Sequence, residues 1–102
     1  MAKIKICGLK RNEDIEYVNE LKPDYIGFIL SQGFRRSIAV EEARELKSML
    51  GSGIKAVGVF VNEPIENVCL DFIDLVQLHG SESPEYCAKI EIPVIKVLKP
   101  DM

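Results

Sequence analysis

Short runs rich in Val and Ile alternate along this chain with stretches in which apolar residues recur at helical spacing. The runs occupy residues 3–7, 25–30, 55–61, 74–79 and 94–98, and their starts are 19 to 30 residues apart. This alternation is typical of strand–helix units in which right-handed crossovers join parallel strands. The sequence therefore predicts an α/β fold with five parallel strands and four helices.

Two of the helices are predicted from apolar spacing and two from their start signals. Residues 12–21 and 41–50 each repeat apolar side chains on one helical stripe. The stripes consist of Ile15, Val18 and Leu21 in the first range and of Ala43, Leu46 and Leu50 in the second. Asn62 is expected to cap a short third helix that has Pro64 in its first turn and continues through residue 72. Ser83 followed by Pro84 predicts the start of the fourth helix.

Composition restricts the classes of protein to which this chain can belong. With 102 residues, 47% of them hydrophobic, the expectation is one domain over residues 1–102. The net charge of −3, without a long basic run, argues against nucleic acid as a partner. The apolar runs are far shorter than the roughly 20 residues of a membrane span, so no membrane partner is expected. Three widely spaced cysteines, Cys7, Cys69 and Cys87, predict reduced thiols in a cytoplasmic protein without a zinc site.

The faces of the predicted strands distinguish a closed barrel from an open sheet. Side chains alternate along a strand, so Lys5 and Cys7 share one face of the first strand, and Gln77 and His79 share one face of the fourth. In the fifth strand, Lys96 is expected on the same polar face. A barrel accounts for this pattern because its helices cover only the outer side, whereas an open doubly wound sheet is covered on both. The alternative is that these are edge strands of an open sheet.

The length of the chain is small for a complete barrel. A (β/α)8 barrel takes about 250 residues, whereas the fifth predicted strand here ends close to Met102. We therefore expect about half of a (β/α)8 TIM barrel. Strands one and five would then present unpaired edges, which favours a homo-oligomer or pairing with a missing C-terminal half.

Three side chains at predicted strand ends are candidates for chemistry. Cys7 ends the first strand before Gly8 and stands where barrel enzymes place catalytic residues, although a lone strand cysteine is more often an apolar packing residue. Arg36, beside Arg35, follows the second strand and could bind a carboxylate or phosphate, although most adjacent arginines are merely solvated. His79 ends the fourth strand and could be a second ionisable group, or equally a neutral ring capping the interior.

Five segments of the chain, taken together and in order, resemble one known family, the phosphoribosylanthranilate isomerases of tryptophan biosynthesis. The matching segments are Lys5-Ile6-Cys7-Gly8-Leu9, Tyr25-Ile26-Gly27-Phe28, the Arg36 loop, Val57-Gly58-Val59-Phe60-Val61-Asn62 and Val76-Gln77-Leu78-His79-Gly80. The resemblance implies a (β/α)8 aldose–ketose isomerase that converts N-(5-phosphoribosyl)anthranilate to 1-(2-carboxyphenylamino)-1-deoxyribulose 5-phosphate. It also implies that no cofactor or metal is used.

The resemblance further implies roles for individual residues. Cys7 falls on the general base of the family, and Arg36 falls on the arginine that holds the anthranilate end of the substrate; we place His79 with Arg36 among the substrate-binding residues. The general acid and the phosphate-binding loops of the family correspond to positions beyond Met102, and Asp101 is not assigned to either role. We therefore expect the 102-residue chain to have little activity alone.

Two other hypotheses are carried forward. The chain could be a non-catalytic half-barrel module that pairs with itself or with a partner through its open edges. It could also be another phosphosugar-handling barrel, which the specific cysteine and arginine matches disfavour.

Overall fold

The fold is a five-stranded parallel sheet with its helices placed between successive strands. In the computed structural model, which describes residues 4–68 and 70–96, the strands are β1 (Lys5–Cys7), β2 (Tyr25–Ile29), β3 (Lys55–Phe60), β4 (Leu75–Leu78) and β5 (Val94–Lys96). They lie in sequence order, β1-β2-β3-β4-β5, and each neighbouring pair is parallel. Within the described residues this is the half-barrel arrangement that the sequence predicts.

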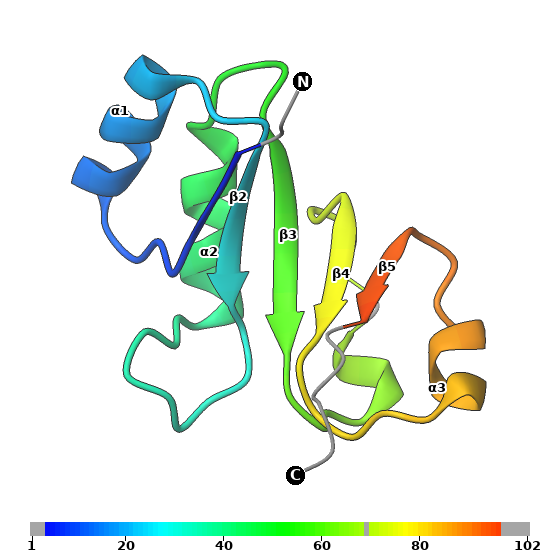
Figure 1. The fold of residues 1–102 in the computed structure, drawn as a ribbon. Helices are drawn as coiled ribbons and strands as arrows, with labels where there is room; N and C mark the ends of the chain where they lie inside the picture. The colour runs from blue at the N-terminus through cyan, green and yellow to red at the C-terminus, as the bar shows by residue number, and fades with distance from the viewer. Residues whose placement is uncertain (1–3, 69, 97–102) are drawn as a thin grey trace, which may run out of the picture.

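The helices are α1 (Asn12–Leu21), α2 (Val40–Ser48), the single 3-10 turn η1 (Ile65–Asn67) and α3 (Pro84–Ala88). Figure 1 shows α2 behind β2 and the short turn η1 beyond the arrowhead of β4, whereas no drawn helix crosses the near side of the sheet. Alternate residues of each strand therefore meet two different environments.

The strand register identifies these two faces. Cys7 lies beside Gly27, Gly27 beside Val57, and Val57 beside Leu75, so these residues share one face, which we call the inner face. Two residues further along the strands, Ile29, Val59, Gln77 and Ile95 continue it. Its side chains are of mixed polarity, and several are only half-buried.

The opposite, helix-covered face forms the hydrophobic core. Six of its strand residues are 0–1% exposed, namely Ile26, Phe28, Ala56, Phe60, Val76 and Leu78. Ile15 and Val18 of α1 and Ala43 and Leu46 of α2 pack into the same cluster. Leu21, predicted on the α1 stripe, is 55% exposed because it is the last residue of the helix.

The third predicted helix is wrong in both its start and its length. Asn62 does not cap a helix: its φ of 51° is left-handed, and its N–H donates to the Glu82 carboxylate. Pro64 instead precedes the short turn η1, and the chain must then reach β4 at Leu75. The fourth helix starts as predicted, since the Ser83 hydroxyl accepts a hydrogen bond from the Tyr86 N–H at 3.1 Å.

The face assigned to Lys96 is also wrong. The register places Lys96 beside Leu78 and Ile95 beside Gln77, so Lys96 lies on the helix-covered face and Ile95 on the inner face. Alternation within a strand fixes which residues share a face, but only pairing with the neighbouring strand decides which face that is. The predictions for Lys3, Cys69, Val97, Leu98 and Asp101 lie outside the described residues.

Candidate active site

Cys7 ends β1 with its thiol packed over the backbone of β2. The sulfur lies so close to Gly27 that a Cβ added there would be 2.7 Å from it. The chain then turns at Gly8, whose φ is +85°, and the N–H groups of Gly8 and Leu9 donate to the Gly27 carbonyl at 2.9 and 3.3 Å. The thiol is therefore half-buried at the carboxyl end of the sheet, where parallel β/α proteins place their ligands.

Arg36 reaches the same end of the sheet from the loop after β2. Its side chain crosses Gly8 closely, since a Cβ added to Gly8 would lie 2.6 Å from the Arg36 Cδ. Cys7 and Arg36 line one cleft of about 610 Å³, together with Lys10 and Arg11. Arg35, which precedes Arg36 in the sequence, does not line this cleft.

The Arg36 loop is fixed by its own hydrogen bonds. The Ser37 hydroxyl donates to the Ser31 carbonyl at 2.6 Å and accepts from the Phe34 N–H at 3.0 Å. The Ile38 N–H donates to the Ile29 carbonyl at 2.9 Å. The exposed guanidinium of Arg36 therefore projects from an ordered turn, and no ion pair holds it within the part of the chain that the structure describes.

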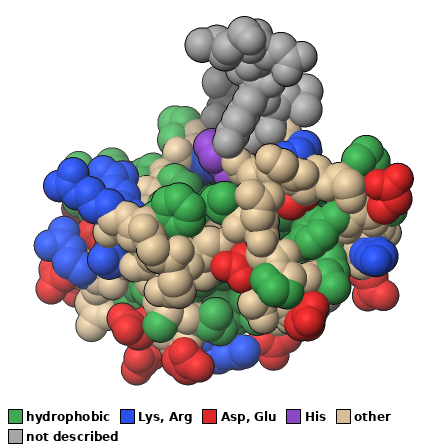
Figure 2. Space-filling model, turned by 90° about the horizontal axis from the view of Figure 1, so that it is seen from below, with side chains coloured by type: hydrophobic (Ala, Val, Ile, Leu, Met, Phe, Trp, Pro, Cys, Tyr) green, Lys and Arg blue, Asp and Glu red, His purple; other side chains and the backbone are tan. Residues whose placement is uncertain are grey.

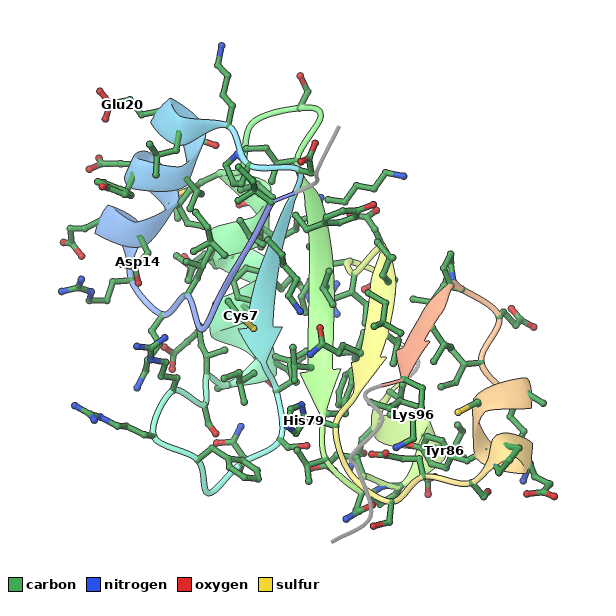
Figure 3. All side chains as sticks on the ribbon, in the orientation of Figure 1. Cys7, Asp14, Glu20, His79, Tyr86 and Lys96 are labelled. Atoms are coloured by element: carbon green, nitrogen blue, oxygen red, sulfur yellow. The ribbon has the colours of Figure 1, made fainter. Side chains whose placement is uncertain are left out.

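His79 follows β4 and shares a second hollow with Cys7. Its N–H donates to the Phe60 carbonyl at 2.9 Å, which continues the β3–β4 pairing. The hollow has a volume of about 330 Å³, and its lining includes Cys7, Phe34, Gln77 and His79. Figure 3 shows Cys7 and His79 near the arrowhead ends of the strands. Cys7 and His79 therefore lie on the same side of the sheet, as the predicted polar strand face requires.

The two hollows meet at Cys7. The structure places Arg36 on the larger one and His79 on the smaller one, and Cys7 borders both. Figure 2, which looks onto the carboxyl ends of the strands, shows the histidine beside hydrophobic side chains and a group of Lys and Arg side chains toward one side. A ligand that contacts all three residues would extend across the thiol.

Lys5, which the sequence places on the same strand face as Cys7, has its own hydrogen-bond partner. It lies two residues before Cys7 on the inner face, and its ammonium donates a hydrogen bond to the side-chain oxygen of Gln77. This contact joins β1 to β4 across the inner face, so two of the predicted polar residues meet there as expected.

Glu82 is a buried acidic residue that the sequence reasoning missed. Its side chain is 1% exposed, and its carboxylate accepts hydrogen bonds from the N–H of Asn62 at 2.8 Å, the N–H of Gly80 at 3.0 Å and the Lys96 ammonium at 3.0 Å. Burial raises the pKa of this carboxyl, but the bonds from Asn62, from its own backbone N–H and from Lys96 outweigh it and lower the pKa below its ordinary value. The sequence signal that could have identified Glu82 is its position, two residues after Gly80 at the end of a predicted strand.

No metal site is evident in residues 4–68 and 70–96, where no three His, Cys, Asp or Glu side chains are grouped for ligation. No helix of that part is long and apolar enough to cross a membrane.

A parallel sheet whose strands lie in sequence order, with ionisable side chains at their carboxyl ends, is typical of the class of β/α-barrel proteins. Comparisons with known proteins identify the family. Residues 4–102 match the family model of N-(5'-phosphoribosyl)anthranilate (PRA) isomerase. The chain belongs to this family.

Individual relatives agree with that assignment. The N-(5'-phosphoribosyl)anthranilate isomerase of Thermoanaerobacter sp. (strain X514) is 53% identical over 90 residues, which are 84% of this chain and 44% of the relative. The crystal structure of phosphoribosyl anthranilate isomerase from Thermotoga maritima superposes with a TM-score of 0.87 at 40% identity, over 94% of this chain and 50% of that one.

A second solved structure adds a ligand. It is a phosphoribosyl anthranilate isomerase in complex with reduced 1-(o-carboxyphenylamino)-1-deoxyribulose 5-phosphate, matched with a TM-score of 0.87 and 40% identity over 94% of this chain and 53% of that one. The present chain thus spans about half the length of the relatives that it matches.

Proposed function

We propose that this chain carries the strand-one to strand-five side of a phosphoribosylanthranilate isomerase site. The substrate is N-(5-phosphoribosyl)anthranilate and the product is 1-(2-carboxyphenylamino)-1-deoxyribulose 5-phosphate. One observation carries the proposal: Cys7 borders both the hollow that Arg36 lines and the hollow that His79 lines. Family membership and the ligand of the solved relative support the same substrate class.

The proposed reaction is an Amadori rearrangement. An acid protonates the ring oxygen of the furanose, and the ring opens to an iminium. Cys7, as thiolate, then removes the proton from C2, and the electrons of that bond form an enamine, which tautomerises to the ketone. Arg36 binds the anthranilate carboxylate through charge-assisted hydrogen bonds, and His79 contacts the sugar portion. We assign the acid to no residue of this chain.

Binding of the reduced product analogue tests the role of Arg36. Titration calorimetry with reduced 1-(o-carboxyphenylamino)-1-deoxyribulose 5-phosphate should give weaker binding for Arg36→Met by about 10- to 100-fold, the usual effect of losing a hydrogen bond to a charged group. Arg35→Met is the matched control, because Arg35 carries the same charge one residue away and does not line the cleft. Equal affinity of the Arg36→Met variant and the wild-type chain, or no binding by the wild-type chain, would contradict the proposal.

Alkylation of the thiols tests the place of Cys7. Iodoacetamide should modify Cys7 more slowly when the analogue is bound, because the ligand covers the thiol. Cys87 is the internal control: it is also half-buried and free, but it lies on α3 away from both hollows. Mass spectrometry of the two peptides measures both rates. Equal protection of the two cysteines would show that ligand acts on the whole fold rather than at Cys7.

Isomerase turnover, followed by the loss of anthranilate fluorescence, tests the chemistry itself. Any turnover by the purified chain should fall by about 10²- to 10⁴-fold in Cys7→Ala, the usual contribution of a general base. Turnover that survives this substitution would remove Cys7 from the proposed role.

A further inference from the structure

A set of contacts beside the proposed site joins the loops that follow three strands. We call it the Glu82 clamp; it consists of Asn62 after β3, Gly80 and Glu82 after β4, and Lys96 at the end of β5. Glu82 lines neither of the hollows that Cys7 borders, and the proposed chemistry does not use it. Among the ion pairs formed by the described residues, Glu82 is nevertheless the most buried partner, with 1% of its side chain exposed.

We propose that Glu82 is a positioning residue that fixes the main chain of His79 at the carboxyl end of β4. It thereby fixes the point from which the imidazole side chain extends. The inference rests on the proposed function only for the role of the imidazole, which is to contact the sugar portion of the substrate. Its geometry is independent of that function, because it concerns only contacts within the chain.

The hydrogen bonds hold the two peptides around His79 from both sides. On the β3 side, the His79 N–H donates to the Phe60 carbonyl at 2.9 Å. On the other side, the Gly80 N–H donates to Glu82 Oε1 at 3.0 Å, and the Gly80 carbonyl accepts a hydrogen bond from the Lys96 ammonium. The main-chain groups that flank the histidine are thus bound by partners on β3, β5 and the loop itself.

Close packing with Asn62 reinforces the same segment. A Cβ added at Gly80 would lie 2.5 Å from Asn62 Oδ1, and that oxygen also accepts a hydrogen bond from the Ser81 N–H at 2.8 Å. Asn62 itself adopts its left-handed φ of 51° while its N–H is bound to Glu82 Oε2 at 2.8 Å. The carboxylate therefore controls the conformation of the β3 loop as well as that of the β4 loop.

Only an ionised carboxylate satisfies this arrangement. Three donors, the N–H groups of Asn62 and Gly80 and the Lys96 ammonium, converge on its two oxygens. A glutamine in the same place has one acceptor oxygen, and its NH₂ group would face one of these donors. At least one buried main-chain N–H would lose its partner, so the loop would have to move.

The single histidine of the sequence makes the proposal directly measurable. We compare the wild-type chain with Glu82→Gln by NMR, recording the ring signals of His79 and hydrogen exchange at the Gly80 amide. Glu82→Gln should shift the ring signals toward those of histidine in the unfolded chain and speed Gly80 exchange by about 10-fold or more, the effect of losing one buried hydrogen bond. The Phe28 and Val57 amides, in the core of the sheet, should keep their protection. Glu85→Gln is the matched control, since Glu85 is an exposed carboxylate three residues away.

A milder variant guards against loss of the fold. Lys96→Met removes one donor and leaves the carboxylate bound to two N–H groups, so it should shift the His79 signals in the same direction by a smaller amount. Unchanged ring signals and Gly80 exchange in both variants would overturn the proposal. Equal loss of protection at Phe28 and Gly80 in both variants would also overturn it, because Glu82 would then support the whole fold.

Ligand binding separates this inference from the proposed function. If the function is right, Glu82→Gln and His79→Ala should each weaken binding of the reduced product analogue, and the double variant should bind no more weakly than His79→Ala alone. Additive losses would overturn the positioning role. Absence of binding by the wild-type chain would refute the proposed function and leave the NMR comparison to decide the role of Glu82.

Discussion

Two glycines make room for the two side chains that matter most to the proposed site. Gly27 leaves space beside its Cα for the Cys7 thiol, and Gly8 lets the Arg36 side chain lie across the turn after β1. Gly8 also adopts a φ of +85°, which residues with a Cβ rarely adopt. At the residue scale, the positions of Cys7 and Arg36 therefore depend on two glycines, which have no side chain to react or bind.

Substitution of Gly8 tests this dependence. Gly8→Ala and Gly33→Ala both place a Cβ at a left-handed residue, so each should destabilise the fold by roughly 1–2 kcal/mol in urea unfolding. Gly33, with φ of +94°, has no atom within 4 Å of such a Cβ, whereas at Gly8 the Arg36 Cδ would be 2.6 Å away. Only Gly8→Ala should therefore weaken binding of the reduced product analogue, and by an amount similar to that for Arg36→Met. Equal binding by the two glycine variants would show that Arg36 does not depend on this contact.

An acidic residue in the first turn of α1, Asp14, binds the residues that precede the helix. The carboxylate of Asp14 accepts hydrogen bonds from the Lys10 N–H at 3.0 Å, the Arg11 N–H at 3.1 Å and the Arg11 guanidinium at 3.3 Å. Partial burial raises the pKa of Asp14, but the Lys10 and Arg11 contacts outweigh it and lower the pKa below its ordinary value. Because Lys10 and Arg11 line the cleft beside Cys7, the start of α1 also shapes the site.

Removal of this carboxylate should lower stability in a pH-dependent way. Asp14→Ala is expected to cost about 0.5–2 kcal/mol at neutral pH, as for other helix caps. The pKa of Asp14 is lower in the folded chain, so its contribution is complete above the ordinary aspartate value and is lost as the pH falls through the folded pKa. Thermal melts should therefore show a constant gap between the wild-type chain and Asp14→Ala at neutral pH, and the gap should close in acid. Glu13→Ala, in the same helical turn but exposed, should show a much smaller gap. A gap that persists unchanged in strong acid would exclude the carboxylate as its source.

At the scale of the whole molecule, the alternation of apolar runs with helical stretches was enough to predict the parallel sheet. The polar faces of the strands favoured a half-barrel, and the strands of the structure lie in the sequence order of such a barrel. The bounds of α1 were also predictable, because its apolar stripe and polar flanks are local features. Lys96 was placed on the wrong face because register is a relation between two strands. Glu82 was missed for a similar reason, since its partners Asn62 and Lys96 are 20 and 14 residues away and meet it only in the folded chain.

The outer strands of the sheet carry apolar side chains that face solvent. In the described residues β1 pairs only with β2, and β5 pairs only with β4. Ile95 of β5 lies on the inner face and is 39% exposed, and Ile4, beside β1, is 60% exposed. Unpaired strand edges with exposed apolar residues promote association between chains.

We therefore expect the purified chain to associate with itself, with a sedimentation coefficient that rises with protein concentration. Ile95→Lys places a charge on the edge strand and should reduce this rise, because burying an unpaired ammonium in a contact between chains is costly. Ala88→Lys adds the same charge at an exposed position of α3 and should sediment like the wild-type chain. A wild-type coefficient that does not change with concentration would mean that the two edges do not drive association. If Ile95→Lys and the wild-type chain associate equally, the contact between chains lies elsewhere than at β5.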